Sequence, residues 1–428
     1  GSALQQMGLS QATSMKDADV VVLNSCVVRQ SAEDKVTGTL GILKPLKADN
    51  PNRIVALMGC MVGPKTDDLR ARFPYVDTFM RPQQYQPLLE LLGDRMGIDA
   101  EGCLGTLVPP RASVTAFIPI IHGCDKFCTF CIIPYRRGRE ISRPAPEIVH
   151  EITVMVDRGV KDITLLGQNV DSYGHDIRPR LDLADLLEQV HEISGLERIR
   201  FLTSHPNDMS VRILEAVRDL PKVCENINLP FQAGDDALLV NMRRGYTIGQ
   251  YLEKISQVKE TIPGVNLTTD LIVGFSGETD NQFERSLDVL RAVEFDKVHV
   301  AAYSNREGTY ASRNMPDTVD RSIKKARLVA IDEVQQKIQT VKNAKLVGRA
   351  FEVLIEGRKR SRLHGRTRGD KLVYIDTQNS QSLEPGQTML VEITSSSPWS
   401  LEAYLAPFNY ADDGNNSHRV NKEKVPVA

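Results

Sequence analysis

Short apolar runs and amphipathic stretches alternate regularly through the middle of the chain, from Ala116 to Ser304. The apolar runs predict strands at 116–121, 162–168, 198–204, 226–231, 267–275 and 297–304. Apolar residues at helical spacing predict helices between them, at Pro146–Arg158, Leu183–Ile193, Met209–Leu220, Ile248–Ile262 and Asp280–Val293. This alternation predicts an α/β fold with a parallel sheet and helices outside. Six units suit an open partial (β/α)6 barrel better than the closed eightfold one.

Residues 1–108 predict a smaller, N-terminal parallel α/β domain. Ala18–Leu23 and Arg53–Met58 are apolar runs that predict buried strands, and the stretch between them predicts a helix. The first strand stops at Asn24-Ser25-Cys26 and the second at Gly59-Cys60. Parallel sheets bind ligands at the carboxyl ends of their strands. Two cysteines at equivalent strand ends therefore indicate a ligand site, although a single buried cysteine is more often only a small hydrophobic residue.

The last quarter of the chain has a different pattern. A long amphipathic stretch predicts a helix at roughly Ser322–Val347. Short β runs with Gly and Ser turns follow up to residue 406, which is typical of a small C-terminal β-barrel. We expect domains at 1–108, 109–341 and 342–406, followed by a mobile polar tail at 407–428.

The composition is that of a globular protein with more than one domain. The chain has 428 residues, 41% hydrophobic and 25% charged, and no apolar run approaches a membrane span, so we expect no membrane partner. The net charge of −2 creates no overall attraction to nucleic acid, so a nucleic-acid site has to be a local patch. Seven cysteines are an odd number, which argues against a disulfide framework and favours the reducing cytoplasm.

The most specific motif is the run Cys124-x3-Cys128-x2-Cys131, directly after the first predicted strand of the barrel. Three thiolates can bind three of the four irons of a cubane cluster, and full ligation of the cluster by cysteine takes four thiolates. The iron left open suits the binding and one-electron cleavage of S-adenosylmethionine (SAM). A structural zinc site is the alternative, but it takes four ligands and paired C-x2-C segments. We expect Phe127 and Phe130, which interleave with the cysteines, to shield the cluster or to pack in the core.

Glycines and amides follow several other predicted strands. A glycine at a strand end lets a ligand approach the backbone, and an amide side chain can bind a cofactor's polar groups. The candidate cofactor-binding residues are Phe130, Gly167, Gln168, Asn169, Gln232, Gly274 and Gly277. Each segment alone is also consistent with an ordinary turn, but all fall at the predicted mouth of the barrel, where barrel active sites are built.

A basic cluster lies in the predicted β-barrel. The candidate RNA-binding residues are Arg358, Lys359, Arg360, Arg362, Arg366 and Arg368. Basic side chains clustered on a hairpin can bind the phosphate backbone of RNA, although a solvated loop can have the same composition. The stretch Arg136-Arg137-Gly138-Arg139 after the cysteine run is an alternative site for a phosphate or a carboxylate.

These motifs resemble those of the radical SAM methylthiotransferase family, from about Leu4 to Ala406. Asn24-Ser25-Cys26 and Met58-Gly59-Cys60 resemble its N-terminal cluster-binding domain. Cys124–Glu140 resembles its radical SAM core, and 348–406 its RNA-binding TRAM domain. The MiaB type is the most similar, and the segments that carry this likeness are Cys128–Tyr135, Leu165–Val170, Thr203–Pro206 and Met242–Thr247.

The resemblance implies an enzyme that adds a methylthio group to C2 of N6-isopentenyladenosine beside the anticodon of tRNA. It implies two [4Fe-4S] clusters, one on Cys124, Cys128 and Cys131 and one on N-terminal cysteines including Cys26 and Cys60. One SAM would methylate the donated sulfur, and a second would be the radical source. The implied partners are tRNA and a flavodoxin-like or similar electron donor, and we expect a monomer.

The family uses a third N-terminal cysteine ligand, for which this sequence has no matching position. We expect that ligand upstream of position 1 or absent, since Cys103, the next cysteine after Cys60, matches no ligand of the family. A related enzyme of the same reaction class would act on threonylcarbamoyl-adenosine in tRNA or on a ribosomal protein. A different class is a non-catalytic RNA-binding iron–sulfur protein. The cysteine spacing argues against that class, because a purely structural cluster would gain from a fourth thiolate.

Overall fold

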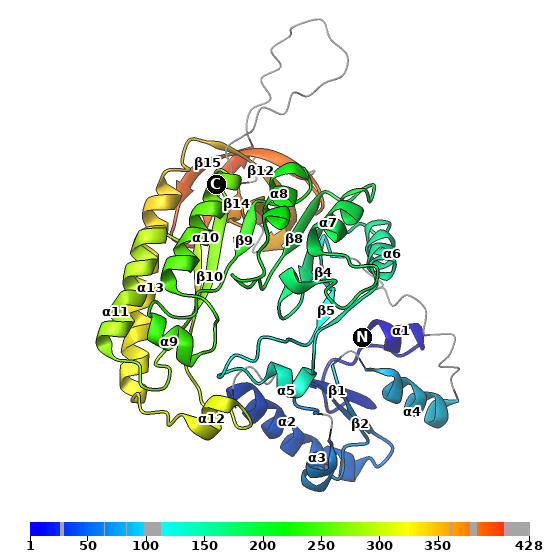
Figure 1. Cartoon of the computed structure of the whole chain (residues 1–428). Coiled ribbons are helices and arrows are strands. Elements are labelled where there is room, and N and C mark those ends of the chain that lie inside the picture. Colours follow the sequence, from blue (N-terminus) through cyan, green and yellow to red (C-terminus); the bar gives the residue numbers. More distant parts are fainter. Residues whose placement is uncertain are drawn as a thin grey trace, which may run out of the picture. The chain divides into compact units, whose positions relative to one another are not determined.

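The computed structural model divides the chain into two compact units (Figure 1). The residues it describes are 1–25, 30–63, 65–82, 84–97, 113–359, 362–376 and 383–405. The first unit contains Gly1–Arg111, His122–Ile141 and Ser304–Asp317, and the second contains Ala112–Ile121, Ser142–Tyr303 and Thr318–Ala428. These units cut across the domain bounds expected from the sequence, because the cysteine run belongs to the first unit.

The first unit is built on a three-stranded parallel sheet. Strands β1 (Val20–Ser25), β2 (Ile54–Gly59) and β3 (Thr78–Met80) lie in this order. Val55 and Leu57 of β2 pack on one side of the sheet, and Ile54 and Ala56 pack on the other. Helices cover both sides, so β2 is apolar throughout. The helices are α1 (Ser2–Gln6), α2 (Gln30–Asp49), α3 (Asp67–Arg72) and α4 (Gln86–Met96).

Within the described residues, the second unit has six parallel strands in two sheets of three. One sheet has the order β4 (Thr115–Pro119), β7 (Asp162–Leu166), β8 (Arg198–Phe201), and the other β9 (Asn226–Asn228), β10 (Asn266–Val273), β11 (Lys297–Ala302). Ile199 of β8 forms a parallel bridge with Val223, just before β9, which brings the two sheets edge to edge. The strand order follows the chain, and no described bridge joins β4 to β11. The prediction of an open partial barrel is confirmed.

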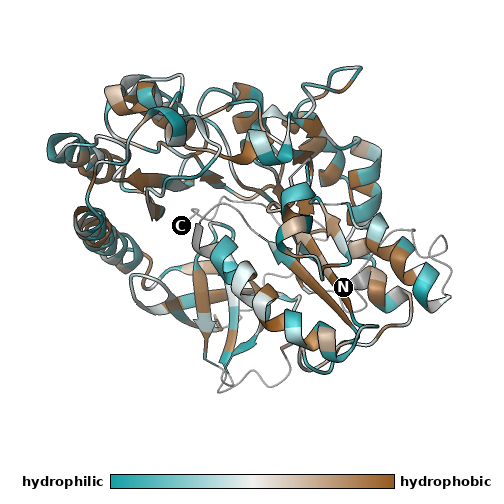
Figure 2. Ribbon diagram, turned by 90° about the horizontal axis from the view of Figure 1, so that it is seen from below, coloured by the Kyte–Doolittle hydropathy of each residue, from teal (hydrophilic) through white to brown (hydrophobic). Residues whose placement is uncertain are grey.

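Amphipathic helices flank these sheets, and polar caps define several helix starts. The hydroxyls of Thr247 and Thr279 accept hydrogen bonds from the backbone of Gln250 and Gln282, whose side chains accept from the threonine N–H groups in return. Figure 2 shows these helices striped with hydrophilic and hydrophobic colour. They are α6 (Ala145–Val156), α7 (Leu183–His191), α8 (Val211–Asp219), α9 (Asp236–Asn241), α10 (Ile248–Thr261) and α11 (Asp280–Val293). No helix in the described ranges has both the length and the apolar character that crossing a bilayer needs.

A closed five-stranded barrel completes the second unit, as the sequence predicts. Helix α13 (Arg321–Ala344) leads into it, and the strands close in the order β12-β13-β14-β16-β15. At the start of β12 every second residue points into the barrel, and Phe351, Val353 and Ile355 help to fill its interior. The strands are β12 (Ala350–Lys359), β13 (Arg362–Thr367), β14 (Leu372–Ile375), β15 (Thr388–Ser396) and β16 (Leu401–Leu405).

Buried arginines join this barrel to the parallel sheet. Arg200 on β8 pairs with Asp162 of β7 at 2.9 Å, and both side chains are less than a tenth exposed. Its other N–H groups donate to the carbonyl oxygens of Thr367 and Arg368 at 3.0 and 2.7 Å. Arg198, two residues earlier, donates to the same hairpin of the barrel. A buried guanidinium is stable only when its donors are paired, so these bonds fix the hairpin against the sheet.

The predicted strands of the core are confirmed, but several end earlier than expected. The prediction 198–204 ends at Phe201, and the prediction 226–231 ends at Asn228. Thr203 has a φ of 73°, which an extended strand does not allow. In the small barrel the apolar runs of the sequence predict strands at Ala350–Ile355, Leu372–Ile375, Met389–Ile393 and Ser400–Ala406, and none at β13. The polar and glycine residues of β13 conceal the alternation of inward-facing and outward-facing side chains.

The Arg200–Asp162 pair gives the first prediction. Arg200→Ala should lower the free energy of unfolding by about 3–5 kcal/mol, because it leaves a buried carboxylate and two carbonyls unpaired. Arg218→Ala is the matched control, since Arg218 pairs with Asp219 on the surface, and it should leave the free energy of unfolding almost unchanged. Urea unfolding measures both. Equal small effects would contradict a structural role for Arg200.

Candidate functional site

The three cysteines of the run lie on one loop of the first unit, His122–Ile141. Two short paired strands, β5 (Ile121–His122) and β6 (Ile141–Ser142), form its base, and α5 (Ile133–Arg137) follows the last cysteine. The Cys131 N–H donates to the carbonyl oxygen of Cys128 at 3.0 Å, which closes a tight turn between these two ligand candidates.

Gly123 lets the two ends of this loop meet. Its φ is 78°, and a Cβ at this position would lie 2.0 Å from the carbonyl oxygen of Arg139. The next residue, Cys124, donates its N–H to the carbonyl oxygen of Gly138 at 3.2 Å. A side chain at position 123 would therefore separate the first cysteine from the far end of the loop.

The three thiols differ in exposure. Cys128 is buried at 7% exposure, whereas Cys124 and Cys131 are partly exposed. Burial raises the pKa of the Cys124 thiol to about 11, so the metal-free thiol holds its proton at neutral pH. Metal binding displaces such a proton, because the ligand is the thiolate.

The donor atoms of the run are those that hold iron–sulfur clusters. Thiolate sulfur is the usual ligand of cubane clusters, and three thiolates bind three different irons. Within the described residues, no three His, Cys, Asp or Glu side chains converge on a position for one metal ion. The chemistry of the three cysteines thus fits a cluster with one iron free of protein ligands.

Aromatic and charged side chains fix the loop. Phe127 has a φ of 48°, and its ring meets Tyr135 edge to face with centroids 6.1 Å apart. The Arg139 guanidinium lies 5.5 Å from the Phe127 ring centre and pairs with Asp125 at 3.1 Å. Phe130, predicted to contact the cofactor, is half-buried. Arg139 therefore serves the structure of the loop itself.

Cys60 lies directly past the end of β2 and is 3% exposed. The preceding Gly59, opposite Ser25 in the sheet, has a φ of 100°, and a Cβ there would lie 2.3 Å from the Ser25 carbonyl oxygen. The Ser25 hydroxyl donates to the carbonyl of Met58 and accepts from the N–H of Met61 at 3.1 Å. The Cys60 N–H donates to the Ser25 carbonyl at 3.0 Å. These bonds fix the strand ends at which the sequence places cysteines.

Arg137 connects Cys60 with the cysteine loop inside the first unit. Its Nε donates to the Cys60 Sγ at 3.1 Å. A charged N–H donor of this kind stabilises negative charge on a sulfur ligand. The sequence presents Arg137 only as part of a basic stretch, because the two residues are 77 positions apart.

The segment Ser304–Asp317 also belongs to the first unit, a placement that the sequence does not predict. The Ala311 N–H donates to the carbonyl oxygen of Thr129, between two ligand candidates, at 2.9 Å. Arg306 pairs with Glu33 at 3.5 Å. No local pattern signals these contacts. Three residues named from the sequence, Cys26, Cys103 and Arg360, lie outside the described residues.

In the second unit, unpaired acceptors follow strand β7. The Oε1 of Gln168 and the Oδ1 of Asn169 are buried without a hydrogen-bond partner in the described part of the chain. Asn169 is fixed by its Nδ2, which donates to Asp208 at 2.6 Å. Gly167 packs so tightly that a Cβ would lie 2.3 Å from the Ile121 side chain. Buried acceptors left open at a strand end fit a ligand with amine donors, which SAM has.

Left-handed backbone recurs at neighbouring strand ends of the same unit. Thr203 after β8 has a φ of 73° and Gln232 after β9 a φ of 67°. Such conformations cost about 1–3 kcal/mol each for residues other than glycine, and they cluster where ligands bind. After β10, Gly274 and Gly277 adopt φ values of 71° and 77° without this cost.

A buried ion pair supports the glycine loop after β10. Glu278 accepts from the Gly274 N–H and pairs with Arg327 of α13 at 2.7 Å. Burial raises the pKa of the Glu278 carboxyl, which the adjacent Arg327 partly offsets. The predicted cofactor residues of this loop thus lie on a braced turn.

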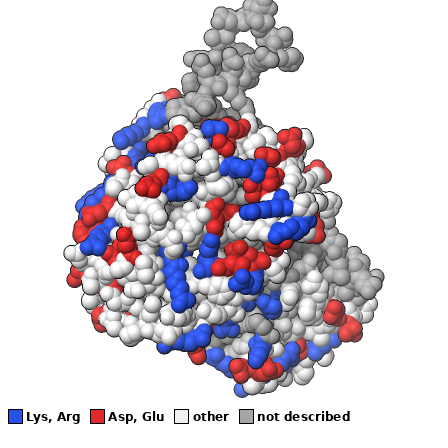
Figure 3. All heavy atoms as spheres, in the orientation of Figure 1, with Lys and Arg blue, Asp and Glu red and all other residues white. Residues whose placement is uncertain are grey.

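The predicted RNA-binding residues divide into two groups. Arg368 makes two 2.9 Å bonds to Glu225 of the core, and Arg366 pairs with Glu356 and Asp370 at 3.4 and 3.3 Å. Both side chains therefore serve the structure of the second unit. Arg358 and Lys359 are exposed, and Arg362 is exposed beside Glu402. On the face drawn in Figure 3, basic and acidic side chains are interspersed.

Three segments of the chain match known families. Residues 118–290 match the Radical SAM superfamily, residues 1–81 the Uncharacterized protein family UPF0004, and residues 344–406 the TRAM domain. The tRNA-2-methylthio-N(6)-dimethylallyladenosine synthase of Dehalococcoides mccartyi (strain CBDB1) is 44% identical over 95% of this chain and 94% of its own length. The synthase of the same name from Roseiflexus sp. (strain RS-1) is 44% identical over 95% of this chain and 85% of its own.

A solved structure shares the fold. It is the radical S-adenosylmethionine methyltransferase TsrM from Kitasatospora setae, with cobalamin and a [4Fe-4S] cluster bound. The TM-score is 0.52 at 15% sequence identity, over 68% of this chain and 65% of that chain.

The Gly59 contact gives a second prediction. Gly59→Ala should destabilise the first unit by about 2–4 kcal/mol, through strained backbone and overlap with the Ser25 carbonyl. Gly41→Ala is the control, because Gly41 lies in α2 with open space around its Cα, and it should stabilise by up to about 1 kcal/mol. Limited proteolysis in a urea series reports on both. A Gly59→Ala protein as resistant as its parent would contradict the close approach.

Proposed function

We propose, because this chain belongs to the family of tRNA-2-methylthio-N(6)-dimethylallyladenosine synthases, that it adds a methylthio group to C2 of N6-dimethylallyladenosine beside the anticodon of tRNA. This nucleoside is the N6-isopentenyladenosine expected from the sequence. The family is one of radical SAM methylthiotransferases that use SAM and [4Fe-4S] clusters. The observation that carries the proposal is the C-x3-C-x2-C loop in a chain that matches these enzymes along nearly its whole length.

We assign the first cluster to Cys124, Cys128 and Cys131. Bound there, a cluster supplies the electron for reductive cleavage of SAM. The chain's own part is to keep the loop closed through Gly123 and to exclude water from the buried Cys128. The amide oxygens of Gln168 and Asn169 are proposed to accept hydrogen bonds from the amines of SAM, and the left-handed turn at Gln232 to present its backbone to the cofactor.

We assign the sulfur-donating cluster to the N-terminal cysteines, including Cys60 and Cys26. Support comes from the fixed strand end at Cys60 and from the Arg137 donor, which stabilises negative charge on a ligand sulfur. The partner tRNA is supported by the family and by the TRAM domain. The proposal includes a flavodoxin-like or similar electron donor and a monomeric enzyme that works in the cytoplasm.

The two cluster assignments predict separable defects. Cys128→Ala should abolish formation of 5'-deoxyadenosine, since it removes one of three ligands. The double variant Cys26→Ala, Cys60→Ala should still cleave SAM but should yield no methylthio product. Cys224→Ala is the control, because this cysteine is buried in the second unit and should keep both activities. Both products are measured by mass spectrometry after reduction with dithionite. SAM cleavage at the parent rate by Cys128→Ala, or methylthiolation by the double variant, would refute the assignment concerned.

The exposed part of the basic hairpin is proposed to grip the tRNA backbone. Replacing Arg358, Lys359, Arg360 and Arg362 with Ala should reduce the slope of log affinity against log salt by roughly 0.7–0.9 for each lost phosphate contact. Reductive SAM cleavage without tRNA should stay unchanged. Arg368→Ala should instead lower stability, because this side chain is bonded to Glu225. A folded quadruple variant with the parent's salt slope would exclude the hairpin from RNA binding.

A further inference from the structure

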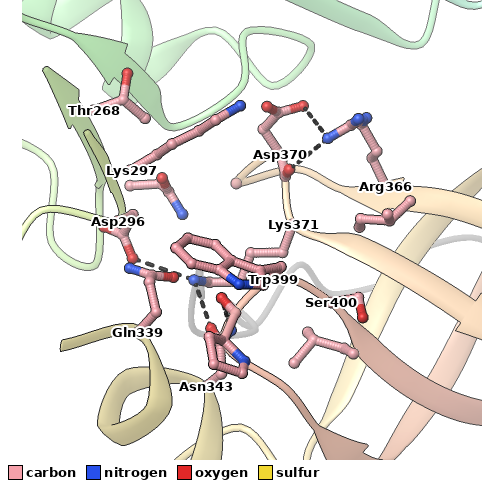
Figure 4. A pocket seen from close by; sticks show the side chains of 15 residues that line it. Thr268, Asp296, Lys297, Gln339, Asn343, Arg366, Asp370, Lys371, Trp399 and Ser400 are labelled. Carbon is pink, nitrogen blue, oxygen red and sulfur yellow. Dashed lines mark hydrogen bonds and ion pairs between the residues drawn. The ribbon is translucent and has the colours of Figure 1, made fainter. Parts of the chain in front are cut away.

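A cavity of about 260 Å³ lies in the second unit between the small barrel and the amino ends of β10 and β11. Its walls come from the start of both strands, the end of α13, the β13–β14 hairpin and the turn between β15 and β16 (Figure 4). A cavity slightly smaller than a drug-sized pocket suits a single flat ring system. The proposed function assigns this cavity no role.

Trp399, the single tryptophan of the sequence, lines the cavity and is 60% exposed. The turn that carries it is held in place from two sides. The Asn343 side chain of α13 donates to the carbonyl oxygens of Ser397 and Pro398 at 2.8 and 3.2 Å. The Ser397 hydroxyl accepts from the N–H groups of Trp399 and Ser400 at 3.3 and 2.9 Å. These bonds fix the backbone of the turn, which lowers the ordering cost when a partner contacts the exposed indole ring.

The charges in the cavity leave one cation uncompensated. Asp296 is bonded to Lys371 at 3.3 Å and to Lys342 at 2.8 Å, and Asp370 is bonded to Arg366. The side chain of Lys297, the first residue of β11, is exposed and makes no hydrogen bond or ion pair within the described residues. Figure 4 shows its side chain and the Trp399 ring on the same cavity. A flat ring beside a free ammonium group suits a nucleotide, whose base stacks and whose phosphate is an anion.

A buried amide adds a specific donor. Asn266, the first residue of β10, lines the cavity at 3% exposure, and its Nδ2 has no partner in the described part of the chain. Ordered water would satisfy this donor, but it would leave the exposed indole ring of Trp399 on the same cavity without a role. An acceptor on a base edge satisfies the donor and uses the ring as well.

We propose that this cavity binds one nucleotide of the tRNA, with the base stacked on Trp399 and its phosphate on Lys297. The inference rests on the proposed function, which supplies the RNA. β10 runs from this cavity to the carboxyl strand ends over eight residues, which is roughly 25 Å at 3.3 Å each. The cavity is therefore a docking site away from the proposed cofactor loops, and its nucleotide is not the one that is modified.

The test uses full-length unmodified tRNA and the intrinsic fluorescence of the single tryptophan. Binding should quench Trp399 emission, because a stacked base lies against the indole. Trp399→Ala should weaken tRNA binding about 5- to 150-fold in a filter assay, the range of one base stacked on an aromatic ring. Trp399→Phe keeps an aromatic ring on which a base can stack, so it should recover part of the lost affinity for tRNA. Lys297→Ala should lower the salt slope by roughly 0.7–0.9.

Tyr404→Ala is the matched control, since Tyr404 is an exposed aromatic residue of the same barrel that does not line the cavity. It should bind tRNA as the parent does. Parent-like tRNA binding by Trp399→Ala, with no fluorescence change in the parent, would overturn the inference and leave the proposed function standing. Saturable quenching by AMP, with unchanged tRNA binding in Trp399→Ala, would overturn it in favour of a free-nucleotide pocket. A parent protein that binds no tRNA would overturn both proposals.

Discussion

Two guanidinium groups buried at the amino end of β8 determine how the second unit is assembled. Apolar packing would hold a small barrel against a sheet in many orientations, because it has little directionality. The bonds from Arg200 to Asp162 and to two carbonyls of the hairpin allow only one. These bonds also explain why the basic residues from Arg358 to Arg368 divide into a group bonded inside the second unit and a group exposed to solvent. Arg366 and Arg368 lie where the barrel meets the core, whereas Arg358 and Arg362 are further along, in solvent.

Much of this fold follows from local patterns in the sequence. Apolar runs and helical spacing predict the six core strands, the longer helices between them and the small barrel, because each element buries one continuous face, whereas the short helix α9 is not predicted. Strand ends were less predictable. Thr203 is a good strand former by type, yet it adopts a left-handed turn that the surrounding structure imposes. Strand β13 carries arginine, histidine and glycine, and it forms because it pairs with β12 on one side and β14 on the other in the closed barrel.

The residues of the candidate site were also predictable only in part: those in local motifs were, and those that meet through distant contacts were not. The spacing of Cys124, Cys128 and Cys131 identifies the chemistry, since few ligands other than a cluster require it. Gln168 and Asn169 are candidates from their position after a strand, and the structure adds that one side-chain oxygen of each is buried without a partner in the described residues, while their binding of a cofactor stays a prediction. The bond from Arg137 to Cys60 joins distant positions, and charge composition alone cannot distinguish an arginine with an internal partner from one offered to RNA.

The first unit is assembled from three stretches of chain, the last of which is Ser304–Asp317. This arrangement has a consequence for synthesis on the ribosome. The N-terminal sheet emerges early, but the unit cannot close until its third stretch has been made. The delay is about 200 residues, or roughly 10–40 s at the usual speed of translation. Cys60 is translated long before the segment that supports the cysteine loop, so the residues proposed to hold the clusters are not yet fully supported in the nascent chain during that interval. On the proposed cluster assignment, insertion of iron and sulfide therefore follows the synthesis of Ser304–Asp317.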